Sequence, residues 1–316
     1  MKDDEVARGQ WEALSIANLD VQLYLPATQP RHGSGRALMI NLHGCAQKNL
    51  DLRVYGNWEG VANHYGMIVA MPQAPGTHFF MPMGSFANRF SGCWDYYGMI
   101  HDEKEDHAVE VLNLVHELVA NKDLNIDPAQ VYVTGFSSGG TLSMIMGCME
   151  PDLIAGVGSN SGPALGSGEA DLIVMNPFYP PPFFDGSRVR ENCEKLSQGK
   201  PGFDTQMASF IHDDLDLFVN YKHSTVNVAG MRELYGADAS ESFSLSEAGG
   251  INPFGSGRYY SDKQGNRISF ITNTGMNHAW AAGTISPNVM WISVSSVEYP
   301  SYVTDFFFQN NRRITR

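Results

Sequence analysis

Five residues near the middle of the chain, Gly135-Phe136-Ser137-Ser138-Gly139, have the pattern Gly-x-Ser-x-Gly. This pattern is typical of a sharp turn from a strand into a helix, where small flanking residues let a serine side chain stand clear of a sheet. Here it follows an apolar, strand-like run and precedes a helix-like stretch, so we interpret Ser137 as a nucleophile. A serine hydroxyl is a weak nucleophile at its ordinary pKa, so it needs a base and a carboxylate that orients the base.

His278 is the histidine best placed to be that base. Only His212, His223 and His278 follow Ser137, and in folds that use this turn the acid and the base both come later in the chain. His212 falls inside a strand-like run and His223 inside a helical pattern, so we expect both to be structural. His278 lies in a glycine-bearing loop directly after the strand-like run 267–273.

Three carboxylates are candidates for the acid. Asp213, Asp214 and Asp216 all lie at the end of the strand-like run before His278, and spacing alone does not choose among them. The backbone N–H of Ser138, at the positive end of the following helix, is expected to face an oxyanion formed on the attacked carbonyl.

The elements that must position these side chains alternate between strands and helices. Several runs are continuously apolar, as in a sheet that is buried on both faces. Helical periodicity appears between them at 54–66, 105–122 and 221–234, and a final helix is expected over about 288–310. The alternation predicts an α/β fold with a mostly parallel central sheet and helices on both faces. The expected strands are 21–25, 36–44, 66–76, 131–135, 153–162, 206–214 and 267–275, with a hairpin over 258–270.

The segment 163–200 interrupts this alternation. It contains Asn-Pro-Phe-Tyr-Pro-Pro-Pro-Phe-Phe at 176–184, where three consecutive prolines forbid a regular strand or helix. Two interpretations stay open: a long connection that packs its own rings, or a lid that faces the substrate. We find no repeat and no obvious linker, so residues 1–316 are expected to form a single domain.

Composition excludes several classes of function. The chain has 316 residues, 43% hydrophobic and 17% charged, which suits a globular protein with a large core. A net charge of -13 opposes binding to nucleic acid, which is driven by Lys and Arg. No stretch approaches the roughly 20 apolar residues of a membrane span. No Cys or His pair has a ligand-like spacing, so no metal is expected.

Five motifs in order resemble the catalytic domain of poly(3-hydroxybutyrate) depolymerases, which belong with esterases of feruloyl and acetylxylan type. The resemblance covers about residues 36–310. It implies the α/β-hydrolase fold with a lid-like insertion at about 163–200, and a serine esterase that needs no cofactor. The motifs are LHGCAQ (42–47), GCWDYYG (92–98), VYVTGFSSGG (131–140), FIHDDLDLFVN (210–220) and GMNHAW (275–280).

The resemblance also implies roles for single residues. It makes Ser137 the nucleophile and His278 the base, and it aligns the acid best with Asp216. Asp213 stands where the family pattern commonly has glycine, so Asp213 and Asp214 stay open as alternatives.

The cysteines are interpreted through the same resemblance. The N–H of Cys45 is similar to the family's second oxyanion donor, beside that of Ser138. A family-like disulfide would join Cys45 to Cys93, and Cys148 with Cys193 is the candidate second pair. The alternative is four buried thiols in a reducing cell. The start of the chain lacks the apolar core of a secretory signal, so we expect a secreted or periplasmic mature chain, with a cytoplasmic protein as the alternative.

Further side chains near these motifs have two interpretations each. Trp94 and Trp280 would form an apolar, substrate-binding wall for a polyester strand, or they pack in the core. His43, beside the oxyanion loop, is expected to brace that loop by hydrogen bonds and not to act as a second base.

The expected substrate is a polyester or a soluble oligomeric ester, with no nucleic acid partner. The chain ends directly after the last predicted helix, so we expect no separate polymer-binding module. Adsorption to a polymer would then fall to surface aromatics. The alternatives are a feruloyl or acetylxylan esterase and a binding protein without catalysis. The candidate aromatics are Phe178, Tyr179, Phe183 and Phe184.

Overall fold

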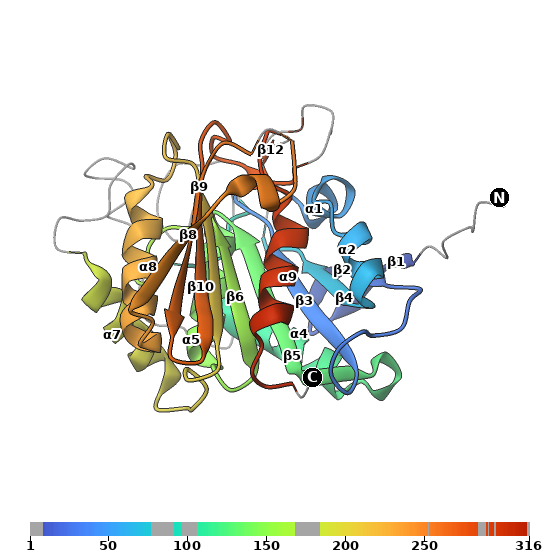
Figure 1. Ribbon diagram of the computed structural model, residues 1–316. Helices are drawn as coiled ribbons and strands as arrows, with labels where there is room; N and C mark the ends of the chain where they lie inside the picture. The colour runs from blue at the N-terminus through green and yellow to red at the C-terminus, as the bar shows by residue number, and fades with distance from the viewer. Residues whose placement is uncertain are drawn as a thin grey trace, which may run out of the picture.

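The computed structural model describes residues 9–76, 92–96, 106–167, 184–251, 253–283, 289, 291–293 and 295–314. A ten-stranded sheet runs through these residues in the order β1-β2-β4-β3-β5-β6-β7-β10-β9-β8 (Figure 1). The six strands from β4 to β10 in this order are parallel, and the two strands at each edge are antiparallel. The strands are β1 (Gln10–Ile16), β2 (Leu19–Leu25), β3 (Arg36–Leu42), β4 (Ile68–Pro72), β5 (Ile126–Phe136), β6 (Ile154–Asn160), β7 (Met207–His212), β8 (Ala239–Phe243), β9 (Gly255–Asp262) and β10 (Gly265–Asn273), and a separate pair is formed by β11 (Trp280–Ala281) and β12 (Ile292–Ser293).

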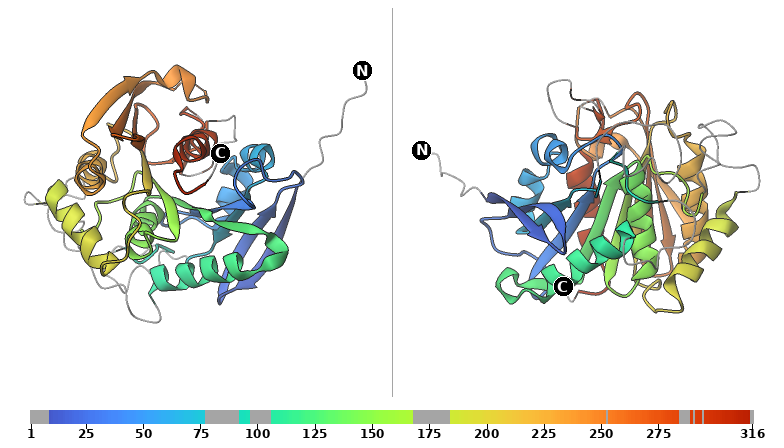
Figure 2. Two further views of the ribbon diagram at one scale, coloured as in Figure 1. Left: turned by 60° about the horizontal axis from the view of Figure 1, so that its bottom comes forward. Right: turned by 180° about the vertical axis from the view of Figure 1, so that it is seen from behind.

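Helices cover both faces of the sheet. This is expected because the strands are apolar at successive positions, and successive side chains point to opposite faces. In β3, Leu38, Ile40 and Leu42 pack in one core cluster, whereas Met39 packs in the other. The first cluster takes in α4, α5, α7 and α8, and the second takes in α1, α2 and α9; Figure 2 shows α9 and the pair α4 and α5 on opposite sides of the sheet. The helices are α1 (Asn49–Tyr55), α2 (Glu59–Tyr65), α4 (His107–Ala120), α5 (Ser138–Met149), α7 (Gly186–Ser197), α8 (Lys222–Tyr235) and α9 (Tyr299–Asn310).

The sequence predicted the parallel strands but misjudged two helices. The helix expected over 54–66 is two short helices, because α1 ends at Tyr55 and Asn57 has a φ of 62° that no helix continues through. The helix expected from about 288 begins only at Tyr299, and residues 292–293 form β12 instead. Pro300 lies in the first turn of α9, where its missing N–H is tolerated.

The insertion at 163–200 is described only in part. Residues 168–183, with most of the proline-rich segment and the aromatics Phe178, Tyr179 and Phe183, lie outside the described residues. The described part contains α7, which packs against α5 and α8. A disulfide joins Cys148 of α5 to Cys193 of α7, which confirms the second predicted pair. Across the described ranges, no helix is both long enough and apolar enough to span a membrane.

An ion-pair cluster joins the C-terminal segment to the β9–β10 hairpin. Asp262 lies 2.8 Å from Arg267 Nη1, and it accepts a hydrogen bond of 2.7 Å from Arg312. Hydrogen bonds from Arg312 hold the pKa of Asp262 well below its usual range. Partial burial acts in the opposite direction, and a hydrogen bond from Arg267 lowers the pKa further. The carboxylate is therefore stabilised more in the folded chain than in the unfolded one.

We expect Asp262→Asn to lower the free energy of unfolding by about 2 kcal/mol at pH 7. A lowered folded pKa contributes stability above the unfolded pKa of about 4, and the contribution is lost as the pH falls toward the folded pKa. The difference between the two proteins should therefore be smaller at pH 3 than at pH 7 in urea denaturation. Glu150→Gln, which removes an exposed pair with Lys200, is the control and should cost less than about 1 kcal/mol. An equal loss from Asp262→Asn at both pH values would contradict this account.

Candidate active site

Ser137 lies on the sharp turn between β5, which ends at Phe136, and α5, which begins at Ser138. Its backbone has φ 53° and ψ -118°, a conformation that side chains rarely adopt and that neighbouring contacts must hold in place. One such contact is the Ser137 N–H, which donates to the carbonyl of Asn160 at the end of β6 over 2.8 Å. The turn presents the serine side chain at the carboxyl edge of the parallel strands.

The two glycines of the motif are there because the turn leaves no space for a side chain. A Cβ atom on Gly135 would lie 2.3 Å from the backbone of Gly139. A Cβ atom on Gly139 would lie 2.5 Å from the carbonyl oxygen of Leu42 in β3. Both distances are below any real contact, and both involve backbone atoms that cannot rotate away.

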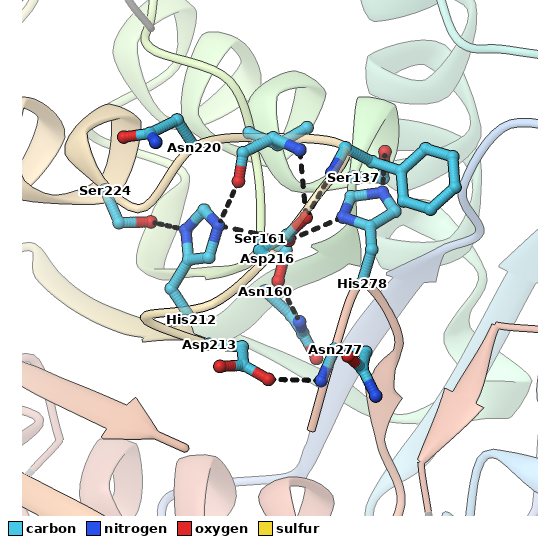
Figure 3. A network of polar contacts seen from close by, with 12 residues as sticks. Ser137, Asn160, Ser161, His212, Asp213, Asp216, Asn220, Ser224, Asn277 and His278 are labelled. Carbon is cyan, nitrogen blue, oxygen red and sulfur yellow. Dashed lines mark hydrogen bonds and ion pairs between the residues drawn. The ribbon is translucent and has the colours of Figure 1, made fainter. Parts of the chain in front are cut away.

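The structure brings Ser137, His278 and Asp216 together, from three loops far apart in sequence (Figure 3). Ser137 Oγ lies 3.0 Å from His278 Nε2, and His278 Nδ1 lies 2.7 Å from Asp216 Oδ2. All three side chains are more than nine-tenths buried. Among the three candidate carboxylates, only Asp216 contacts the imidazole in this way, whereas Asp214 is exposed and Asp213 binds elsewhere.

Hydrogen-bond donors surround the Asp216 carboxylate. Oδ1 accepts from the N–H groups of Phe218 (2.8 Å) and Val219 (2.9 Å), and His212 Nε2 lies 3.2 Å from Oδ2. Burial by itself would raise the pKa of Asp216, but hydrogen bonds from His212 and His278 outweigh it and hold the pKa below its ordinary value. Asp216 is therefore an anion that fixes the Nδ1–H tautomer of His278.

His212 belongs to β7, as the sequence indicated, but it also contacts the site. Its Nε2 lies 2.8 Å from the carbonyl of Val219, and its Nδ1 lies 2.6 Å from the Ser224 hydroxyl in α8. The Nε2–H is thus shared between Val219 and Asp216, while Nδ1 accepts from Ser224. Sequence reasoning missed this contact, because a histidine inside an apolar strand gives no sign of which loop it faces.

Two other buried side chains clamp the loop that carries His278. Asp213 accepts hydrogen bonds from the N–H groups of Leu215 and Asn277, and its burial raises the pKa of its carboxyl. The Asn160 amide donates to the carbonyl of Ala279 (3.0 Å) and accepts from the N–H of Ala281 (2.9 Å). The same Asn160 holds Ser137 through its backbone, so one residue fixes both the nucleophile and the base. The only sequence sign of Asn160 is a polar residue at the end of a buried strand.

The loop after β3 holds the predicted oxyanion donor Cys45. A disulfide joins Cys45 to Cys93, which confirms the first predicted pair. His43 is buried and donates from Nδ1 to the carbonyl of Gly44 (2.7 Å), while its Nε2 accepts from the Ala74 N–H (3.1 Å). His43 therefore braces the loop, as predicted, and has no free nitrogen for a base.

Ser138 is the first residue of α5, so its N–H belongs to the helix terminus, where no intrahelical carbonyl can accept from it. The Cys45 loop and this helix terminus are further tied together by Trp94. The Trp94 N–H donates to Ser138 Oγ (3.4 Å), and its indole donates to the carbonyl of His43 (2.9 Å). A braced pair of backbone donors would stabilise a developing oxyanion without having to reorganise.

The structure corrects the assignment of Trp94 and Trp280 as substrate-binding residues. Both indoles are fully buried, and Trp280 donates to the carbonyl of Gly56 and stacks near Trp58. Neither ring presents a face to a substrate. The sequence pattern was misleading because a large aromatic beside a catalytic motif also serves to pack the loop that bears the motif.

The chain is similar to known ester hydrolases. The sequence model of the family described as "Esterase PHB depolymerase" matches residues 19–186, slightly more than half of the chain. A poly(3-hydroxybutyrate) depolymerase of Ralstonia pickettii is 34% identical over 315 residues, which cover 96% of this chain and 60% of that protein. An acetylxylan esterase of Coprinopsis cinerea is 26% identical over 198 residues, which cover 55% of this chain and 51% of that protein.

A solved structure of an acetyl xylan esterase from Aspergillus awamori has a TM-score of 0.64 and 17% identity, and covers 85% of this chain and 94% of that one. This likeness confirms the α/β-hydrolase fold. This chain spans about 60% of the length of the Ralstonia pickettii protein.

We expect Gly139→Ala to disrupt the turn, because the added methyl group must push β3 and α5 apart. The free energy of unfolding should fall by at least about 2 kcal/mol, and reaction of Ser137 with a fluorophosphonate should slow sharply. Gly60→Ala is the matched control: it lies in α2 with nothing within 4 Å of the new methyl group, so it should be neutral or slightly stabilising. Equal effects of the two substitutions would contradict the steric account.

We expect His212→Leu to slow fluorophosphonate labelling of Ser137 by about tenfold to a hundredfold, because Asp216 loses a donor and shifts from His278. His212→Gln should recover much of the rate, since its amide nitrogen can donate to the same carboxylate. Thermal unfolding of both variants separates positioning from stability. If both variants label Ser137 equally slowly, the hydrogen bond to Asp216 is not what His212 contributes.

Proposed function

The chain belongs to the esterase PHB depolymerase family, and from that premise we propose that it is a serine esterase acting on poly(3-hydroxybutyrate) or related hydroxyalkanoate oligomers. The observation that carries the proposal is the hydrogen-bonded series from Ser137 through His278 to Asp216, with distances of 3.0 and 2.7 Å. A hydroxyl, an imidazole and a buried carboxylate in this order are what acyl transfer to serine requires. No step of this reaction needs a cofactor.

Ser137 Oγ attacks the ester carbonyl while its proton passes to His278 Nε2. The negative charge that develops on the carbonyl oxygen is stabilised by the N–H groups of Cys45 and Ser138. His278 then protonates the leaving alkoxide, which departs as an alcohol and leaves an ester between the acyl group and Ser137. Water, activated by the same imidazole, repeats the two steps and releases the acid.

Asp216 stabilises the imidazolium that forms in each half of the reaction. Because Asp216 is already ionised and buried, no proton transfer to it is needed. His212, Phe218 and Val219 supply the donors that hold the carboxylate in this ionised form. This arrangement keeps the charge of the imidazolium balanced in a site from which water is largely excluded.

An acetyl or feruloyl esterase is the second candidate function. It is favoured by the similarity to the acetylxylan esterase of Coprinopsis cinerea. A binding protein without catalysis is the non-enzymatic alternative, and the complete triad geometry speaks against it.

We also propose that the protein works in an oxidising compartment, as a secreted or periplasmic protein, and that residues 1–316 form one catalytic domain. The two disulfides support the compartment, since such bonds persist where thiols are not kept reduced. The ten-stranded sheet shared by the described residues supports the single domain.

The proposed function is tested by incubating the protein with amorphous polyhydroxybutyrate, a feruloylated sugar and acetylated xylan, and by analysing the released products. We expect release of hydroxybutyrate units, and a loss of at least about a thousandfold in Ser137→Ala. A fluorophosphonate adduct should form on Ser137 of the folded protein. Cleavage of only the two carbohydrate esters would rule out the depolymerase, and absence of an adduct would favour the binding protein.

A further inference from the structure

The loop that carries Asp216 places its apolar side chains outward and its acid inward. Leu215, Leu217 and Phe218 are 63%, 71% and 55% exposed, whereas Asp216 is only 5% exposed. The usual preference is the opposite, since leucine and phenylalanine belong among the residues most often buried. Three exposed hydrophobic side chains are thus concentrated within four residues of one short loop.

A fourth exposed hydrophobic residue, Phe254, is hydrogen-bonded to the chain just before the His278 loop. Phe254 is 65% exposed, and its carbonyl accepts a hydrogen bond of 2.9 Å from the N–H of Thr274, just before that loop. Asp213 accepts hydrogen bonds from the N–H groups of both Asn277 and Leu215, and so ties the His278 loop to the Asp216 loop. We call Leu215, Leu217, Phe218 and Phe254 the apolar rim. Of the seven large hydrophobic side chains that are exposed among the described residues, these are four.

The apolar rim is continuous with the catalytic site. The Phe218 ring lies 5.5 Å from the imidazole of His278 and 4.9 Å from the ring of Trp291, measured between centroids. Trp291 in turn lies 5.8 Å from the imidazole. These distances are typical of rings in contact. Phe218 therefore links the rim directly to the catalytic imidazole.

We propose that the apolar rim is the docking surface by which this protein adsorbs to a solid, uncharged aliphatic polyester, so that a surface chain is delivered to Ser137. The inference rests on the proposed function and deepens it. Exposed apolar patches of this kind mark interaction sites, because leaving them in water is unfavourable.

The chemistry of the rim favours a polyester over other occupants. Leu215 and Leu217 provide aliphatic contact and no hydrogen-bond donors, which suits the methyl and methylene groups of a polyester and not the hydroxyls of a polysaccharide. The net charge of -13 disfavours a second copy of this chain as the occupant, since two such chains repel each other. A neutral polymer surface meets no such repulsion.

The adsorption test uses Ser137→Ala as background, so that the polymer is not digested while binding is measured. Depletion of protein from solution by amorphous polyhydroxybutyrate gives an adsorption constant. We expect the added pair Leu215→Ser and Leu217→Ser to weaken adsorption at least tenfold, because two aliphatic contacts are lost. The matched control is Leu14→Ser, an exposed leucine on edge strand β1, at the opposite side of the sheet from β7. It should change adsorption less than twofold.

The activity test uses the same leucine substitutions with Ser137 intact. Hydrolysis of the polymer should fall about tenfold more than hydrolysis of a soluble p-nitrophenyl ester. If the parent protein hydrolyses the polymer and the leucine variant adsorbs as well as the parent, the inference is wrong while the proposed function stands. If the parent hydrolyses the soluble p-nitrophenyl ester but neither the polymer nor soluble hydroxybutyrate oligomers, the proposed function fails instead. A change in sedimentation of the leucine variant would identify a second copy as the occupant and overturn the inference.

Discussion

The burial of one ionised carboxylate, that of Asp216, sets the requirements for the rest of the site. A charge removed from water is tolerated only when donors replace the lost solvent. Four donors do so here: the backbone N–H groups of Phe218 and Val219, and the imidazoles of His212 and His278. The two backbone donors hold the Asp216 loop in one shape, and the two imidazoles come from other parts of the chain. The donors that stabilise the charge therefore also fix the positions of the catalytic side chains.

The network extends from this carboxylate because parallel strands end at the same edge of the sheet. Ser137 follows β5, Asn160 ends β6, His212 ends β7, and His278 follows β10. Asn160, at the end of β6, binds Ser137 after β5 through its backbone and Ala279 after β10 through its amide, and Asp213, after β7, binds Asn277 after β10. The polar groups are thus connected across four neighbouring strands, and a buried network of this kind is rigid when its members are satisfied. Rigidity is what an oxyanion site and a positioned base both need.

The sequence predicted the parts that depend on local chemistry. Gly139 and Ser137 could be predicted because the turn itself demands small residues. His278 could be predicted because, of the three histidines after Ser137, it is the one in a loop directly after a strand. Spacing did not choose between Asp216 and Asp213, since the choice depends on how the loop folds; only the family resemblance favoured Asp216. The exposed edge strands β1 and β8 were missed because they carry no apolar run. Trp280 was misassigned because sequence shows the type of a side chain and not the direction it faces.

The exposed leucines follow from the same inward turn of Asp216. Leu215 and Leu217, the two sequence neighbours of the buried Asp216, face solvent in the turn that carries it. That geometry dictates the direction of these positions but not their type, because serine or asparagine would occupy them at lower cost in water. Leucine at both positions, beside Phe218 on the catalytic imidazole, is therefore a feature that folding does not explain. A contact with an apolar substrate does explain it, and it couples adsorption to the loop that orients the base.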